Sequence, residues 1–270
     1  MPAAACPPKQ PGHLRLVGWN VAGAFQNKAH LLRALEPDIA VVSEACDEAR
    51  LIRHGVDDFR AASWIGRSPH KGLLVASWGS ETKTRTLHTE WDQRLEWVLP
   101  VHVKAPLDFS LFGVWSQNLS GEPRRHIRYP SERYRYPCGH LVEAYANVLT
   151  KRPAVLLGDF NHHVLWDKGD PTWDFCSLLD MYRSVGLVSA WHAHHGVEVG
   201  NPNEPATHWH TYNRAKPYHL DYCFVPEEWV PAMSTVWIGG YDEWGAESPR
   251  SDHAPIVVDL NVERLEEQGL

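Results

Sequence analysis

Two polar residues that follow an apolar run are the first candidates for chemistry in this 270-residue sequence. Residues 154–157 have the pattern of a buried strand, and Gly158 is expected to end its regular pairing. In an extended chain, Asp159 and Asn161 point to one side and Phe160 to the other. A buried strand that ends in a carboxylate and a carboxamide is a way to build a rigid polar site. The alternative is that Asp159 and Asn161 simply begin a turn.

Other predicted strands also end in polar side chains. The strand at 14–20 ends in Asn20, and the strand at 39–44 ends in Glu44. Burial of a lone carboxylate is costly unless it is paired or binds a cation. The alternative for Glu44 is an acidic residue in the first turn of a following helix. Polar residues at predicted strand ends recur later in the chain, at Asn118, at Asp221 and at Asp252 with His253. Turn chemistry explains one such strand end more easily than the whole set.

The residues at these positions resemble the ordered motifs of the endonuclease/exonuclease/phosphatase superfamily. This superfamily includes deoxyribonuclease I, exonuclease III and related abasic-site endonucleases, sphingomyelinases and inositol-polyphosphate 5-phosphatases. The resemblance covers residues 14–260, and the layout is also similar to uncharacterised bacterial members, which name no substrate. Single motifs are weak signals, but their joint occurrence in order is strong. The matching motifs are Gly18-Trp19-Asn20, Ser43-Glu44, Gly158-Asp159-Phe160-Asn161, Leu220-Asp221-Tyr222 and Ser251-Asp252-His253-Ala254-Pro255.

The resemblance implies a four-layer α/β sandwich, in which two mixed β-sheets pack face to face with helices outside. It also implies divalent-metal-dependent hydrolysis of a phosphate ester. By this resemblance Glu44 is the principal metal ligand, with Asn20 and Asp252 close by. Asp159 orients or deprotonates the attacking water, and Asn161 holds a phosphate oxygen or the metal shell. Carboxylate and amide oxygens are the ligands that Mg²⁺ prefers, so Mg²⁺ is the expected cofactor, and Mn²⁺ is expected to substitute for it.

The resemblance also implies the contacts to phosphate. His253 is expected to contact the scissile phosphate while Asp221 holds its ring, and Asn118 matches a phosphate-contacting asparagine. A histidine beside an aspartate keeps its proton and can donate to an anion. Lys71, which precedes Gly72, is a further candidate for phosphate contact; a solvated loop lysine is the alternative.

The sequence departs from the superfamily pattern at two places. Abasic-site endonucleases have a tyrosine, and deoxyribonuclease I and the sphingomyelinases a histidine, near the position of Trp115-Ser116. The motifs therefore do not identify the group that assists the leaving oxygen or the phosphate. Relatives often have an arginine where this chain has His219, so His219 either replaces it structurally or contributes a titratable proton donor.

An irregular segment at 121–139 combines positive charge with aromatic rings. We expect its arginines, Arg124 and Arg125 among them, to contact phosphates while its tyrosines stack on bases. The alternative is that the arginines pair with surface carboxylates and the tyrosines pack on the domain. The residues concerned are Arg124, Arg125, Arg128, Arg133 and Arg135, with Tyr129, Tyr134 and Tyr136 between them.

Two groups of histidines lie outside the motifs. His162 and His163 follow Asn161 and are expected at exposed positions or behind the site. His192, His194 and His195 have a spacing that suits zinc, but no cysteine or carboxylate set accompanies them. A solvated loop is therefore the favoured interpretation of these three residues.

Composition limits the class of protein. With 43% hydrophobic and 22% charged residues, the chain suits one large globular domain or two small ones. We expect a flexible lead-in at 1–12 that is no signal peptide, a single domain at 13–262 and a charged tail at 263–270. The odd number of cysteines, without paired spacing, predicts reduced thiols in a cytoplasmic protein. No apolar run approaches the length of a membrane span. A net charge of −7 argues against electrostatic coating of nucleic acid, but not against local phosphate binding through a metal ion.

The pattern of apolar residues predicts more strands than helices. Residues 207–212 and 218–225 are expected to form a hairpin, and 192–205 a loop. Helices are expected at 29–35, 141–149 and 173–185. The remaining strands are expected at 14–20, 39–44, 59–65, 72–77, 95–103, 109–114, 154–157, 187–191, 236–238 and 256–260.

Two functions from different classes fit these observations. The first is a Mg²⁺-dependent phosphodiesterase, expected to act as a monomeric nuclease on DNA or RNA by metal-assisted water attack. A small phosphoester or a lipid headgroup is the alternative substrate. The second is a catalytically silent binding protein with the same fold. The presence of Glu44, Asp159 and Asp252 together with His253 argues against it, because a silent protein has no use for the complete set.

Overall fold

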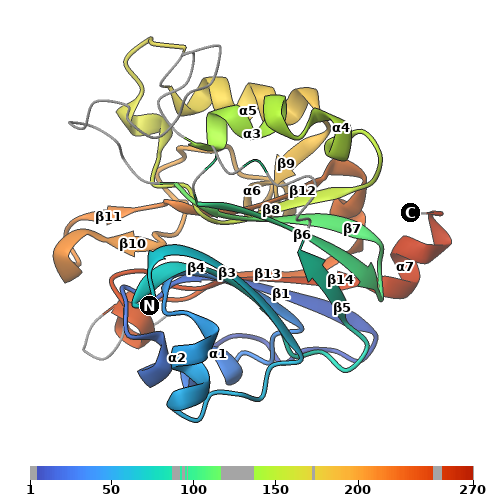
Figure 1. Cartoon of the computed structure of the whole chain (residues 1–270). Coiled ribbons are helices and arrows are strands. Elements are labelled where there is room, and N and C mark those ends of the chain that lie inside the picture. The colour runs from blue at the N-terminus through green and yellow to red at the C-terminus, as the bar shows by residue number, and fades with distance from the viewer. Residues whose placement is uncertain are drawn as a thin grey trace.

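Two stacked β-sheets form the centre of the molecule (Figure 1). The computed structural model describes residues 5–86, 92, 95, 97–116, 137–171, 174–245 and 251–269. The first sheet has the order β13 (Met233–Ile238), β14 (Ile256–Asn261), β1 (His13–Asn20), β2 (Ile39–Ala45), β4 (Lys71–Ser77) and β3 (Ala61–Ser68). The second has the order β5 (Lys83–Thr86), β6 (Val98–Ala105), β7 (Phe109–Trp115), β8 (Ala154–Asp159), β12 (Asp221–Pro226) and β9 (Leu187–Ser189).

Helices cover the outer faces of both sheets. In Figure 1, α1 (Ala29–Arg33) and α2 (Glu48–Arg53) lie on the first sheet, while α3 (Pro137–Ala144), α4 (Ala146–Leu149) and α5 (Phe175–Ser184) lie on the second. The predicted four-layer sandwich is confirmed. The other helical segments are α6 (Ala190–His195), α7 (Val262–Glu267), η1 (Phe25–Asn27), η2 (Val164–Trp166), η3 (His210–Tyr212), η4 (Glu227–Ala232) and η5 (Tyr241–Gly245). No helix in the described part of the chain is both long and apolar enough to span a membrane.

Burial on both faces explains why the central strands are continuous apolar runs. β7 and β8 are buried at every residue, because one face meets the other sheet and the opposite face meets α3 and α5. The sheets approach closely at Gly18 of β1, where an added Cβ would lie 2.7 Å from Cδ1 of Leu157. All five cysteines are free thiols.

Strand direction brings the polar strand ends together. β1 and β2 are parallel, so Asn20 and Ser43 are partners at one edge of the first sheet. β7 and β8 are also parallel, so Trp115 pairs with Asp159 at an edge of the second sheet. β12 is antiparallel to β8, and its first residue, Asp221, pairs with Asp159. The topology therefore gathers polar residues from segments that are far apart in the sequence.

The predicted hairpin is only partly correct. β10 (His208–Trp209) and β11 (Pro217–Tyr218) form a two-stranded sheet. The rest of the second run forms β12, which pairs with β8 and β9 in the second sheet. Its residues are all buried, because the other sheet covers one face of this strand and the helices cover the opposite face. Most of the alternating run at 218–225 therefore belongs to a central strand of the second sheet and not to a hairpin.

Other elements differ from the prediction in their type or bounds. The expected loop at 192–205 begins inside α6, which ends at Gly196 in a left-handed conformation with φ 65°. The predicted helix at 141–149 is divided into α3 and α4. α2 and β5 were not predicted, and α7 begins just before the expected tail. In the expected lead-in, the Pro7 carbonyl accepts a hydrogen bond of 2.8 Å from Arg15, and Lys9 pairs with Asp38 at 2.9 Å.

Candidate active site

Acidic, amide and imidazole side chains meet where the polar strand ends converge. One potential ligand atom from each of Asp159, Asp221 and His253 lies within 4.8 Å of the other two. All three side chains are buried. Asn20 joins this group because its Nδ2 donates a hydrogen bond of 2.9 Å to Oδ2 of Asp159. The structure thus brings together residues from near the two ends of the chain, since Asn20 ends β1 and His253 precedes β14.

Gly158 places Asp159 and does not end the pairing as predicted. β8 continues through Asp159, and Gly158 pairs with both Val114 and Tyr222. Its φ is 142°, and an added Cβ would lie 2.0 Å from the carbonyl oxygen of Val114. Only glycine tolerates this close approach at this backbone conformation.

Substitution of Gly158 by alanine is therefore expected to destabilise the fold. We expect the free energy of unfolding to fall by at least about 2 kcal/mol, since a clash with backbone adds to the cost of the positive φ. Denaturant unfolding followed by circular dichroism measures this loss. Gly169→Ala is the control, because Gly169 has a φ of 80° but no atom within 4 Å of an added Cβ. Equal losses in the two variants would contradict the clash.

Asn161 combines the two interpretations of its motif. Its φ is 49°, so the chain turns there, and its backbone N–H donates to Oδ1 of Asp159 at 2.8 Å. The side-chain amide donates to Oδ2 of Asp159 at 3.0 Å and to the carbonyl of Ser116 at 2.8 Å. Phe160 points the other way and is fully buried. The residues that form the turn therefore also form the polar site, so both interpretations of the motif are correct.

His253 and Asp221 form a buried pair. Nδ1 of His253 lies 2.8 Å from Oδ2 of Asp221, whereas Oδ1 of Asp221 is buried without a hydrogen-bond partner. Burial alone would lower the pKa of His253, but the negative charges of Asp221 and Asp159 outweigh it and raise the pKa above its ordinary value. Burial, followed by the charge of Asp221, raises the pKa of Asp159. His253 therefore keeps its proton at neutral pH.

Glu44 is aimed into the site by a β-bulge. The register of β2 against β4 shifts between Ser43 and Ala45, and Glu44 has the left-handed φ of 61°. Its Oε1 lies 3.5 Å from Nδ2 of Asn20, and its Oε2 lies 2.8 Å from Nζ of Lys71. A non-glycine residue in this conformation is uncommon, so the surrounding packing must hold the backbone of Glu44 in place.

Glu44 is not the residue that begins α2. The N-cap of that helix is Asp47, whose carboxylate accepts a hydrogen bond of 2.8 Å from the backbone N–H of Arg50. The alternative interpretation of Glu44 is therefore wrong, and its carboxylate pairs with Lys71 and Asn20 instead of a helix N-terminus.

Two lysines place positive charge beside the carboxylates. Lys71 is half exposed and lies over the ring of Trp115, with Nζ 5.4 Å from the centroid, while it pairs with Glu44. Lys28 is buried and donates to the carbonyl of Val21. Burial lowers the pKa of Lys28, and the charges of Asp252 and Glu44 oppose that shift. Lys71 therefore lies at the rim of the site, bonded to a proposed metal ligand.

Sequence reasoning missed two residues near Asp252. Nε2 of His208 lies 3.5 Å from Oδ2 of Asp252, and the His208 and His253 rings are 4.4 Å apart between centroids. Tyr212 is 44% exposed. The buried part of its side chain, followed by the negative charges of Asp252 and Glu44, raises the pKa of its phenol. The available signal was the alternation of 207–212, which was interpreted only as a strand.

Trp115 and Ser116, which stand near the position where relatives have a tyrosine or a histidine, are packed inside the protein. Trp115 is buried against Trp97, with ring centroids 4.7 Å apart, and Ser116 is fully buried. The backbone of Ser116 anchors Asn161, as described above. The predicted contacts Asn118, Arg124 and Arg125 lie outside the described residues.

The remaining predicted histidines differ in burial. His162 and His163 are 0% and 2% exposed, so exposed positions are excluded and positions behind the site remain. The solvated loop expected for the other three is wrong at His192, which is buried on α6, whereas His194 is partly buried and His195 is exposed.

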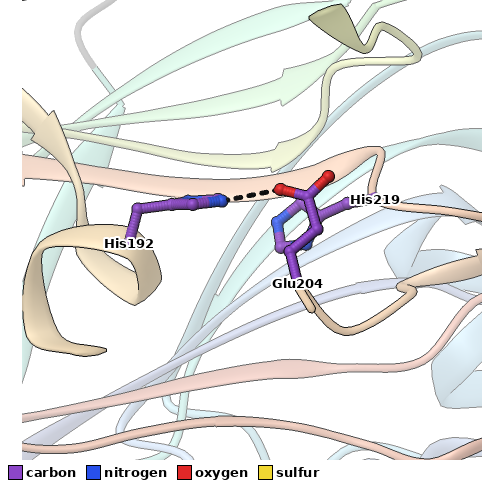
Figure 2. Close-up of side chains that lie close together, drawn as sticks. All are labelled: His192, Glu204 and His219. Atoms are coloured by element: carbon purple, nitrogen blue, oxygen red, sulfur yellow. Dashed lines mark hydrogen bonds and ion pairs between the residues drawn. The ribbon is translucent and has the colours of Figure 1, made fainter. Parts of the chain in front are cut away.

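His219 is also buried, and its Nδ1 donates a hydrogen bond of 2.8 Å to the carbonyl of Pro205. Burial lowers the pKa of His219 to about 4. Its ring faces His192 and Glu204 (Figure 2).

The fold is similar to that of several solved nucleases. A 3'-5' exonuclease (NExo) from Neisseria meningitidis has a TM-score of 0.66 and 18% identity, with 92% of this chain and 100% of that chain covered. A 3' phosphatase NExo variant from Neisseria, bound to product DNA hairpin, has a TM-score of 0.65 and 16% identity over 92% and 99%. The endonuclease domain of TRAS1, a telomere-specific non-LTR retrotransposon, has a TM-score of 0.56 and 13% identity over 93% and 99%.

Neither a protein-family model nor a curated protein sequence matches the chain. The structural similarity is at low sequence identity and extends over almost the whole of each chain. The fold that the motif resemblance implied is therefore confirmed: the chain has a DNase I-like fold.

Proposed function

We propose that this protein is a metal-dependent phosphoesterase that hydrolyses phosphodiester bonds in nucleic acid. The observation that carries the proposal is the buried Asp159, Asp221 and His253 cluster beside the inward-turned Glu44. The structural neighbours give further support, since they are described as an exonuclease, a 3' phosphatase bound to DNA and an endonuclease domain.

His253 provides positive charge for the phosphate. Asp221 holds its ring through Nδ1, so the proton on the other ring nitrogen can be donated to a phosphate oxygen. The imidazolium in a buried site stabilises the charge that develops on the phosphoryl group. Asp221 acts as a positioning residue, because it fixes the orientation and the proton of His253.

Asp159 orients and deprotonates the attacking water. Its carboxylate is held by three donor groups, the Nδ2 of Asn20 and the backbone N–H and Nδ2 of Asn161. These bonds fix the direction of the remaining lone pairs. A raised pKa makes this carboxylate a stronger base than an exposed aspartate, which suits proton abstraction from water.

The donor groups near Glu44 fit a hard divalent cation. Glu44 and Asp252 offer carboxylate oxygens and Asn20 offers its carboxamide oxygen, which now accepts a hydrogen bond of 3.0 Å from the backbone N–H of Ala22. The bulge at Glu44 directs its carboxylate toward Asn20. We therefore propose that these three residues hold Mg²⁺, with Mn²⁺ as a substitute. When bound, such an ion supplies electrostatic stabilisation of the phosphoryl oxygens and the leaving oxygen.

Hydrolysis of two substrates tests the proposal. A generic aryl phosphodiester and a DNA hairpin with a free 3' end are incubated with the protein in Mg²⁺, and parallel reactions contain EDTA. We expect Mg²⁺-dependent cleavage of both substrates. Absence of hydrolysis of every phosphodiester would favour the silent binding protein, and cleavage of the aryl ester alone would favour a small phosphoester or lipid headgroup as substrate.

Salt dependence distinguishes nucleic acid from a small substrate. From the sequence, we expect Arg124 and Arg125 to neutralise flanking phosphates, so the logarithm of DNA affinity should fall with the logarithm of salt by roughly 0.7 to 0.9 per phosphate contacted. The double alanine variant should have a shallower slope and unchanged hydrolysis of the aryl ester. Affinity is measured with Asp159→Asn protein to block turnover, and Arg183→Ala, exposed on α5, is the control. Identical slopes would contradict the nucleic-acid contact.

A further inference from the structure

A second group of potential metal ligands shares no residue with the candidate active site. One potential ligand atom from each of His192, Glu204 and His219 lies within 4.8 Å of the other two. Figure 2 shows the two rings and the carboxylate converging from three separate parts of the chain. The side chains are almost fully buried, at 5% exposure for His192 and 8% for Glu204. Burial of two imidazoles and a carboxylate at one point requires a reason.

His219 has a free lone pair directed into the protein. Its Nδ1 lies 2.8 Å from the Pro205 carbonyl, which can only accept, so Nδ1 carries the ring proton. Nε2 is then an acceptor, and it is buried with no hydrogen-bond partner. An unsatisfied buried acceptor is costly, and a cation is a partner that this nitrogen can bind. The neighbouring Glu204 carboxylate already accepts from His163, from His192 and from the backbone N–H of Gly200 at 3.0 Å, and its negative charge favours a cation.

His192 and Glu204 also have outer partners of the kind that metal ligands have. Oγ of Ser189 lies 2.7 Å from Nδ1 of His192, whose Nε2 lies 2.9 Å from Oε2 of Glu204. The other carboxylate oxygen, Oε1, accepts from Nε2 of His163. The ring proton of His163 is on Nε2 because its Nδ1 accepts a hydrogen bond from a backbone N–H. Outer partners of this type fix the orientation and tautomer of metal ligands.

We propose that His192, Glu204 and His219 form a second metal site, which binds a transition ion of the Zn²⁺ class through Nε2 of each histidine and one carboxylate oxygen. Two imidazoles and a carboxylate suit Zn²⁺ and not Mg²⁺, which prefers oxygen ligands only. Ligand atoms at zinc bond lengths stand about 3.3 Å apart in a tetrahedron, so the hydrogen bond between His192 and Glu204 opens by a few tenths of an ångström. A water takes the fourth position.

Proton transfer within the site is local. In the metal-free protein the Nε2 proton of His192 is donated to Glu204, and the Ser189 hydroxyl donates to Nδ1. When an ion binds, the His192 proton moves to Nδ1, and the Ser189 hydroxyl then accepts a hydrogen bond from that N–H, because a hydroxyl can act as donor or acceptor. His219 already has the tautomer that the ion requires.

Two surface pockets adjoin the ligand cluster. A pocket of about 250 Å³ is lined by His163, Glu204 and His219, among others. A second pocket of about 300 Å³ is lined by residues that include Ser189 and His192. Each pocket is thus lined by at least one of the proposed ligands.

The proposed ion fastens a loop to the strand that carries Asp221. Glu204 belongs to the segment between α6 and β10, and Thr207 in that segment accepts hydrogen bonds of 2.8 and 2.9 Å from the backbone N–H groups of Leu220 and Asp221. Binding therefore ties α6, this segment and the start of β12 together.

Zinc titration of the whole chain tests the proposal. Protein stripped with chelator and dialysed is titrated with Zn²⁺ against a chromophoric chelator, in excess Mg²⁺. We expect His219→Ala and His192→Ala to lose at least about 100-fold in the affinity of one zinc equivalent, and Ser189→Ala to lose about 10-fold or more. His194→Ala, on the same helix but outside the cluster, is the matched control and should retain wild-type affinity.

A second measurement covers variants that fold poorly. Zn²⁺ should raise the midpoint of thermal unfolding of wild type and of His194→Ala, but not of His219→Ala. Co²⁺ in place of Zn²⁺ should give the visible absorption of a four-coordinate site in wild type and in His253→Ala. Equal zinc affinity in wild type, His192→Ala and His219→Ala would overturn the proposal. So would zinc binding that is lost only in His253→Ala, since that result would place the ion in the candidate active site.

Discussion

Replacement of Asp159 by asparagine is expected to lower turnover of a phosphodiester by about a hundredfold or more, as the loss of a general base does. The substitution keeps the size of the side chain but removes the basic carboxylate. Burial and the charge of Asp221 raise the pKa of Asp159, so its ionised form is disfavoured in the folded protein. Above the pKa of an unfolded aspartate, that charge subtracts from stability. Turnover should therefore fall without a matching fall in stability.

The measurement compares kcat and thermal unfolding on the same preparations. We expect the midpoint of Asp159→Asn to remain close to that of wild type or to rise, while kcat falls. Asp180→Asn is the control, because Asp180 is exposed on α5 and 76% of its side chain is accessible. Wild-type turnover in Asp159→Asn would remove Asp159 from the mechanism, and an unfolded variant would show that its role is structural.

His253 completes the same catalytic unit. His253→Ala should lose turnover to a degree comparable with Asp159→Asn, because it removes the cation that contacts the phosphate. Asp221→Asn should be milder, because the amide still occupies the position beside Nδ1 of His253. Near-normal turnover of His253→Ala on every active substrate would contradict this assignment.

Removal of the metal is expected to abolish activity altogether. EDTA should stop hydrolysis, and Mg²⁺ or Mn²⁺ added after removal of the chelator should restore it. Glu44→Gln should weaken Mn²⁺ binding and remove most activity while the fold is retained, since Glu44 is only partly buried and lies at a bulge. Loss of the charged ligand is the physical reason, because Mg²⁺ binds through one or two carboxylates.

Mn²⁺ affinity and activity are measured together on the Glu44 variant. Glu48→Gln is the control, since Glu48 is a nearby acid in the first turn of α2. It should bind Mn²⁺ and hydrolyse phosphodiesters as wild type does. Full turnover in EDTA would exclude the metal from the mechanism, whereas wild-type Mn²⁺ affinity in Glu44→Gln would place the ion on other ligands. Neither result bears on the zinc titration, which has its own readout.

Local pattern in the sequence predicted the central strands, and the resemblance of the ordered motifs to a known superfamily implied the fold class and the candidate site residues. Apolar runs such as 154–157 and 256–260 predicted central strands, because burial on both faces demands uninterrupted apolar residues. The motifs identified Asp159, Asp221 and His253, and the structure brings these three together. Motif order carries this information because each polar residue stands directly at a strand end.

Only the tertiary structure decided which strands pair and which side chains meet. The alternation at 218–225 is compatible with a hairpin strand and with β12, and pairing to β8 and β9 is a long-range contact. The bulge that turns Glu44 inward depends on its register with β4. The sequence also did not predict that Glu204 and His219 lie beside His192, since the three residues come from separate segments of the chain. Periodicity reports burial along one segment, whereas a site depends on distances between segments, and those are set when the whole chain packs.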